Sequence, residues 1–221
     1  MPSALPVAVL VSGRGSNLEA LIRARDAGTL PVEFTLVASD KADAPALRMA
    51  EDHGIATLAL DPRGYADRRA YDLDLFGRIA ASGAELVVLA GFMRILDADA
   101  VAPWHGRMIN IHPSLLPKYR GLHTHRKALA AGDALHGASV HFVTAELDGG
   151  PVIAQAMMDI RPDDTEDSLA ARLLPNEHRL LPATLALIAE GRVHLDDTGI
   201  VYDDKPLETP LRLVDNRLVA A

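Results

Sequence analysis

Apolar residues in the first half of the chain follow two alternating patterns. Short continuous apolar runs are typical of strands buried on both faces, and apolar positions three and four apart predict amphipathic helices. Strands are predicted at Pro6–Val11, Val32–Ser39, Ile55–Leu60, Glu85–Ala90 and Met108–Ile111. Helices are predicted from about Leu18 to Gly28, at Ala44–His53 and at Tyr65–Ser82. Buried strands that alternate with helices indicate an α/β fold whose mostly parallel central sheet is flanked by helices.

The pattern changes after about residue 135. Two strand-like runs, Gly137–Thr144 and Pro151–Ile160, flank a short glycine-containing loop, which predicts an antiparallel pair. A long helix is predicted from about Asp164 to Glu190, with Pro175 as a point where it kinks or breaks. Short strands are expected in the tail at Val193–Leu195, Gly199–Tyr202 and Leu211–Val214.

Composition excludes several classes of protein. The formal net charge of -8 argues against a general nucleic-acid binder, which usually carries a basic excess. The absence of cysteine excludes disulfides, cysteine-ligated metals and thiol nucleophiles. No apolar run approaches the roughly 18 residues of a membrane span, and the N-terminus lacks the pattern of a signal peptide. We therefore expect a cytoplasmic protein without a membrane partner.

The first chemical signal is the loop Ser12-Gly13-Arg14-Gly15-Ser16-Asn17, between the first strand and the first helix. Helix N-termini bind phosphate through free N–H groups, glycines allow close approach, and Ser16 and Asn17 can donate or cap the helix. A dinucleotide fingerprint would need glycine where Leu18 stands, and the Walker lysine is missing. A single phosphate and a turn without ligand stay open. Asp40, after the second strand, keeps a ribose-binding role open.

The second signal is the pair Asn110 and His112 at the end of the fifth strand. In an extended chain their side chains point to the same side, where they can donate to a developing oxyanion or move a proton. Asp148, in the turn Leu147–Pro151, is the candidate carboxylate that would raise the pKa of His112. It lies 148 − 112 = 36 residues further along the chain. A half-buried histidine bonded to backbone is the alternative interpretation.

A metal site is the weaker interpretation of His123-Thr124-His125. Two histidines two apart can share a metal in an extended segment, but the residues that follow have a helical pattern. We therefore expect no metal.

Five segments together resemble the folate-dependent phosphoribosylglycinamide formyltransferases. They are Ser12–Asn17, Leu89–Leu96, Asn110–Pro117, Gly121–His125 and Leu147–Pro151, in this order. The resemblance runs from about Pro6 to Gly191. It implies a Rossmann-like formyltransferase fold in one domain, residues 1–221, with a phosphate-binding half over about 1–110 and a folate-binding and catalytic half over about 111–221.

The resemblance also implies the reaction. A formyl group passes from 10-formyltetrahydrofolate, the co-substrate, to the amine of glycinamide ribonucleotide, without a metal. Asn110 and protonated His112 would stabilise the tetrahedral oxyanion, and Asp148 would keep His112 charged. Both substrates are small molecules, and a monomer or a homodimer is expected.

Further residues match the family's binding sites. Gly15, Ser16, Asn17 and Glu177 correspond to the ribonucleotide site. Arg68, Met93, Arg94, Ile95, Leu96, Asn110, His141 and Asp148 correspond to the folate site. Two positions depart from the pattern: Arg14 adds a cation to the phosphate loop, and Leu174 replaces a polar residue of some relatives.

Related activities remain as alternatives. A formyltetrahydrofolate hydrolase would use water as the acceptor, and another formyltransferase would use a different amine. Methionyl-tRNA formyltransferases carry a C-terminal tRNA-binding domain, whereas only about 30 residues follow the long helix here. A dinucleotide-dependent oxidoreductase and a non-catalytic nucleotide-binding module are the interpretations outside this chemistry.

Overall fold

The computed structural model describes residues 4–220. The chain forms two compact units, which divide between Asn110 and Ile111. Parallel pairing dominates the first unit and antiparallel pairs occur in the second, so the predicted α/β class with a mostly parallel sheet flanked by helices is confirmed. Within the described residues, no helix is both long and apolar enough to cross a membrane.

The strands of the first unit pair in parallel in the order β5-β4-β1-β2-β3. They are β1 (Leu5–Val11), β2 (Val32–Ser39), β3 (Thr57–Ala59), β4 (Leu86–Leu89) and β5 (Met108–His112). All four residues of β4 are buried, as are the last five of β1. These continuous apolar runs explain why the strand positions can be predicted, with differences of one or two residues at the ends.

The helices of the first unit are partly those expected. They are α1 (Ser16–Asp26), α2 (Pro45–Asp52), the 3₁₀ turn η1 (Pro62–Gly64), α3 (Arg68–Ala81), α4 (Ala98–Val101) and the 3₁₀ turn η2 (Ala102–Trp104). Helix α3 begins three residues later than predicted because the Asp67 side chain accepts a hydrogen bond from the Ala70 N–H and caps it there. The sequence does not predict the short helices α4 and η2, because a helix of a single turn is too short to show a hydrophobic period.

The second unit contains the antiparallel pair β6 (Leu135–Phe142) and β7 (Val152–Asp159), as predicted. Strand β11 (Leu211–Val214) adds to β7 in parallel, and β12 (Arg217–Val219) pairs with β11 in antiparallel fashion. The remaining tail forms a small antiparallel sheet. Its strands are β8 (Val193–Asp196), β9 (Gly199–Tyr202) and β10 (Lys205–Pro206). The tail thus contains two strands, β10 and β12, beyond the three expected.

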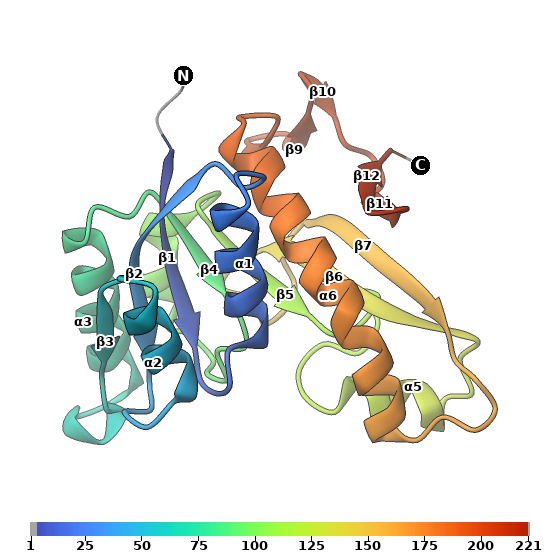
Figure 1. Cartoon of the computed structure of the whole chain (residues 1–221), viewed down its shortest axis with the longest axis horizontal. Helices are drawn as coiled ribbons and strands as arrows, with labels where there is room; N and C mark the ends of the chain where they lie inside the picture. The colour runs from blue at the N-terminus through green and yellow to red at the C-terminus, as the bar shows by residue number, and fades with distance from the viewer. Residues whose placement is uncertain (1–3, 221) are drawn as a thin grey trace. The chain divides into compact units, whose positions relative to one another are not determined.

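Two helices complete the second unit: α5 (Thr124–Ala130) and α6 (Glu166–Ala189), which packs against β6 and β7 (Figure 1). Of the two expected effects of Pro175, a kink or a break, a break does not occur, because α6 runs through both Pro175 and Pro182. A reciprocal capping box between Thr165 and Ser168 starts the helix. Its leucine stripe, including Leu180, is fully buried. Burial of this stripe outweighs the hydrogen bonds that the prolines remove.

We expect Gly150→Ala to destabilise the protein by about 2–3 kcal/mol, because an added Cβ would lie 1.9 Å from the Phe142 carbonyl oxygen. Gly77→Ala is the control: its Cβ would meet open space on α3, and alanine favours a helix by roughly 0.5–1 kcal/mol. Urea denaturation of both variants measures the difference. Equal stabilities would contradict this account of the β6–β7 turn.

Candidate active site

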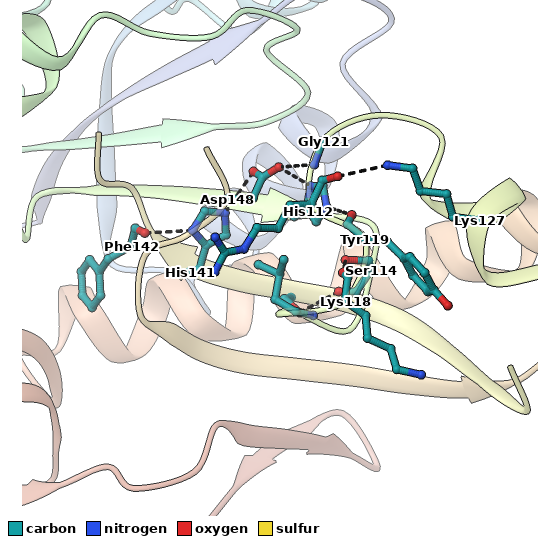
Figure 2. Close-up of polar contacts among 12 residues, drawn as sticks. His112, Ser114, Lys118, Tyr119, Gly121, Lys127, His141, Phe142 and Asp148 are labelled. Carbon is teal, nitrogen blue, oxygen red and sulfur yellow. Dashed lines mark hydrogen bonds and ion pairs between the residues drawn. The ribbon is translucent and has the colours of Figure 1, made fainter. Parts of the chain in front are cut away.

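The carboxylate of Asp148 is the centre of a polar cluster in the second unit. Asp148 has a left-handed backbone, with φ of 48°, in the loop between β6 and β7, and its side chain is 9% exposed. Its Oδ2 lies 3.5 Å from Nδ1 of His112, and its Oδ1 lies 3.6 Å from Nε2 of His141. The Gly121 N–H donates to Oδ2 at 2.8 Å. Figure 2 shows the carboxylate between the two imidazole rings.

Two different local features place the histidines. His112 is the last residue of β5, and His141 lies at a shift in the β6–β7 register, where β7 has one extra residue, Ile153, between the partners of Val140 and His141. A bulge of this kind re-aims the side chain that follows it. The His141 Nδ1 lies 2.8 Å from the Phe142 carbonyl oxygen, which requires Nδ1 to carry the proton and leaves Nε2 toward Asp148. The fold therefore joins residues that are 36 positions apart, from 112 to 148.

Both ring nitrogens of buried His112 face oxygen acceptors. Its Nε2 lies 3.0 Å from the Tyr119 carbonyl oxygen, and its Nδ1 faces Asp148. Only a doubly protonated ring can donate in both directions. Burial opposes that charge, however, and lowers the pKa of His112 below its usual value, although the Tyr119 bond and Asp148 act to raise it. Asp148 thus acts on the pKa of His112 in the expected direction, but in the protein without ligands burial has the larger effect.

The Asp148 carboxyl group is stabilised as the anion. Burial by itself would raise its pKa, but the hydrogen bonds from the His141 side chain and the Gly121 N–H lower it below the usual value. Asp148 is thus ionised at neutral pH. The site holds a fixed negative charge against a histidine that can accept a proton when further negative charge develops beside it.

Asn110 and His112 are two residues apart on β5, so their side chains leave the strand on the same side. Asn110 is half-buried. It belongs to the first unit by sequence, whereas His112 belongs to the second.

The phosphate-type loop in the first unit is shaped by Gly15. This residue has φ of 80° and precedes α1, and a Cβ on it would lie 2.6 Å from the Cβ of Ala46. The Ala46 N–H donates to the Gly13 carbonyl oxygen, which ties the loop to α2. No side chain caps α1, so Ser16 and buried Asn17 lie in its first turn instead of capping it. The N-terminal end of a helix favours an anion, so this turn is a candidate phosphate site.

Asp40 takes part in a hydrogen-bond chain within the first unit. Its Oδ1 accepts a 2.6 Å hydrogen bond from the buried hydroxyl of Ser12, and that hydroxyl accepts the Met93 N–H at 2.9 Å. The carboxylate therefore connects the end of β2 with the glycine loop and with the segment after β4.

That segment, Met93–Leu96, is irregular, and two of its three apolar side chains are exposed to solvent. Met93 is 72% exposed and Ile95 is 54% exposed. The Arg94 guanidinium lies over the ring of buried Tyr71, 4.7 Å from its centroid. Exposed Arg68 lies 3.8 Å from Asp97, and its neighbour Arg69 pairs instead with Asp99 at 2.7 Å.

Sequence reasoning missed Asp72, a fully buried carboxylate on α3 next to Tyr71. Its Oδ2 accepts the Asp97 N–H at 2.7 Å. A signal was present, because Asp72 lies inside the apolar stripe of the helix where solvent-facing carboxylates are not expected.

The histidines considered as metal ligands do not converge. His123 precedes α5 with φ of 62°, whereas the Nδ1 of His125 lies 2.9 Å from the Nε2 of His136. Within residues 4–220, no group of three or more histidine and acidic side chains is arranged to hold a metal. Glu177 lies half-buried on α6.

Comparison with known proteins identifies the family. The model of the formyl transferase family matches residues 5–185. The chain is 47% identical over 201 residues to phosphoribosylglycinamide formyltransferase of Escherichia coli K12, covering 91% of this chain and 95% of that protein. The chain belongs to the formyl transferase family, among the phosphoribosylglycinamide formyltransferases.

Other members agree with this assignment. The structure of phosphoribosylglycinamide formyltransferase from Coxiella burnetii superposes with a TM-score of 0.88 and 45% identity, over 92% of this chain and 95% of that chain. The trifunctional purine biosynthetic protein adenosine-3 of Drosophila melanogaster is 46% identical over 187 residues. That match covers 84% of this chain and 14% of that protein. Membership in this formyltransferase family therefore confirms the predicted family and enzyme class.

The histidine pair of this formyltransferase predicts a loss of stability in acid. Burial, followed by the charge of His125, lowers the pKa of His136 to about 4. Because the unfolded pKa is near 6.5, unfolding takes up a proton below that pH, and stability falls as the pH drops from about 6.5 to 4. The contribution of His136 reaches about 3 kcal/mol at most.

The His136→Asn variant should therefore lose less stability than the unmodified protein across this pH range. Exposed His194→Asn is the control and should keep the steep dependence. Chemical denaturation at several pH values tests this, and parallel curves for all three proteins would contradict it.

Proposed function

We propose that this protein transfers the formyl group of 10-formyltetrahydrofolate to the amine of 5-phosphoribosylglycinamide, giving N-formylglycinamide ribonucleotide and tetrahydrofolate in purine biosynthesis. The observation that carries the proposal is the buried Asp148 carboxylate against His112, with Asn110 two positions away on the same strand. The family membership of the chain supports the same reaction.

The proposed chemistry begins when the neutral amine attacks the formyl carbon. A C–N bond forms, the formyl oxygen becomes an oxyanion, and the amine nitrogen becomes positive. A proton then moves from this nitrogen to N10 of the folate, through water beside Asp148. The bond from the formyl carbon to N10 breaks, the carbonyl re-forms and tetrahydrofolate leaves.

Asn110 and His112 are assigned to the oxyanion. The Asn110 amide can donate without a change of charge. His112 is neutral in the protein without ligands, and the oxyanion would raise its pKa because opposite charge favours imidazolium. A substrate oxygen reaches the ring by replacing one of its two present acceptors, the Tyr119 carbonyl or Asp148.

Substrate phosphate is assigned to the first turn of α1. Gly15, Ser16 and Asn17 stand at the N-terminal end of α1, where the helix dipole favours an anion, and Gly15 lets the backbone approach it closely. Exposed Arg14 has no ion-pair partner within the described residues, so its charge is available to an anion. Glu177 is assigned to the ribonucleotide through the family resemblance.

Folate is assigned to the segment Met93–Leu96. Within residues 4–220, no backbone hydrogen bond outside helices and strands involves Arg94, Ile95 or Leu96, which leaves their N–H and C=O groups to a heteroaromatic ring. Arg68, Asn110, His141 and Asp148 complete the proposed set of folate-contacting residues.

The organisation proposed for the chain is one formyltransferase domain. The phosphate loop belongs to the first unit and the Asp148 cluster to the second, while Arg68 and Met93–Leu96 also belong to the first. We further propose a cytoplasmic enzyme, monomeric or homodimeric, that needs no metal.

The deciding experiment measures deformylation of a 10-formyl folate by absorbance, with and without glycinamide ribonucleotide. Turnover should depend on the ribonucleotide. Asn110→Ala and His112→Ala should each lower kcat about 10²- to 10³-fold, as loss of an oxyanion donor does. Asp148→Asn should lower kcat strongly with substrate binding retained. Asp203→Asn, which disturbs an exposed ion pair with Arg192, is the control and should leave kcat unchanged.

Each departure from this result has a defined meaning. Deformylation without the ribonucleotide would indicate a hydrolase, and turnover only with another amine would indicate a different formyltransferase. Normal kcat in His112→Ala would exclude the proposed mechanism.

Gly15→Ala should raise the KM for glycinamide ribonucleotide more than about tenfold, because the added Cβ meets Ala46 and alanine disfavours a φ of 80°. The KM for the folate should stay within about twofold. Steady-state kinetics with each substrate varied in turn provides the test. An unchanged ribonucleotide KM in a folded variant would remove the loop from the phosphate site.

A further inference from the structure

The backbone from Met93 to Asp97, here called the 93–97 segment, is held at its two ends and free between them. At the first end, the Met93 N–H donates to the Ser12 hydroxyl at 2.9 Å. At the second end, the Asp97 N–H donates to the Asp72 carboxylate at 2.7 Å. Both acceptors are buried side chains outside the segment: Ser12 follows β1, and Asp72 lies on α3. The segment is thus fixed by two side chains and by no strand pairing.

The Asp72 anchor is unusual because a carboxylate is expensive to bury. Asp72 is 0% exposed on α3, and its Oδ1 has no hydrogen-bond partner within the described residues. Burial raises the pKa of Asp72, while the Asp97 N–H and the charges of Arg94 and Arg68 act to lower it. An apolar residue would pack here at less cost, since burying a polar group without full hydrogen bonding is unfavourable.

Asp72 lies next to Tyr71, whose ring is covered by Arg94, the one cation of the 93–97 segment. The charge of Arg94 favours ionised Asp72. Its buried Nε has no hydrogen-bond partner within residues 4–220. Asp72 therefore accepts a hydrogen bond from Asp97 at the end of the segment, and its charge attracts Arg94 within the segment.

We propose that Asp72 is a positioning residue for folate binding, which holds the 93–97 segment in the conformation that presents the backbone of Arg94, Ile95 and Leu96 to the pterin ring. This inference rests on the proposed function, and it assigns a role to a residue that does not itself touch substrate. A segment that is already ordered costs less entropy when a ligand binds, so loss of the anchor weakens binding.

The first test is Asp72→Asn, which keeps an oxygen acceptor for the Asp97 N–H but removes the charge that attracts Arg94. The KM for 10-formyltetrahydrofolate should rise about tenfold, while the KM for glycinamide ribonucleotide stays within about twofold and kcat within about threefold. Calorimetric titration with tetrahydrofolate should show the same loss of affinity. Asp61→Asn, which alters an exposed ion pair of the same unit, is the control and should change neither KM.

The KM values separate positioning from a merely structural role. A lower melting temperature with both KM values unchanged would overturn the proposal, as would an equal rise in both. Coupling gives a further check: Arg94→Met should weaken folate binding less in the Asp72→Asn background than in the unmodified protein. Additive effects of the two substitutions would contradict the proposed charge restraint.

Amide hydrogen exchange on the unmodified protein tests the anchor even where Asp72→Asn folds poorly. The Asp97 amide should exchange slowly without ligand, whereas the Arg94–Leu96 amides should exchange quickly and become protected when tetrahydrofolate binds. The two proposals fail on different measurements. Absence of ribonucleotide-dependent turnover in the unmodified protein would contradict the proposed function, whereas rapid exchange of the Asp97 amide would contradict the anchor.

Discussion

The contact between the Asp148 carboxylate and His112 is the constraint on which the polar cluster of the second unit depends. Asp148 is ionised although its side chain is 9% exposed, because the Gly121 N–H and two imidazoles surround it. That arrangement requires the β6–β7 turn to deliver a left-handed aspartate, and Gly150 lets the turn approach the Phe142 carbonyl. It also requires the register shift before His141. Three local backbone irregularities thus converge on one buried charge.

Burial and charge act against each other throughout the protein, and the balance differs from site to site. At His112 burial prevails and the ring stays neutral, whereas at Asp148 the neighbouring donors prevail and the carboxyl stays ionised. This combination suits formyl transfer, in which negative charge appears only transiently. A histidine N–H whose hydrogen bond strengthens as the oxyanion forms stabilises the transition state more than the ground state. Asp72 shows the same tension in the first unit, where a buried carboxylate orders a segment instead of taking part in chemistry.

Much of the fold could be predicted because its strands are continuous apolar runs with clear ends. Val32–Ser39 is the β2 strand without any shift, and the β6–β7 pair follows from two runs around a glycine turn. The errors have local causes. The Asp67 cap delays α3, the buried leucines carry α6 through Pro175, and the strands β10 and β12 are too short to carry a period. In the two helices, a cap or tertiary packing overrides local propensity.

The sequence by itself determined the α/β class, the family and the residue types of the candidate site, because motifs and apolar periodicity are local properties of the chain. Only the tertiary structure decided that Asp148 reaches His112 across 36 positions, and that His112 is neutral in the absence of ligands. It also decided that Asp40 binds Ser12 and that Asp72 anchors Asp97. Proximity between distant residues and the desolvation of a charge depend on how the whole chain packs, and no short window of sequence contains that information.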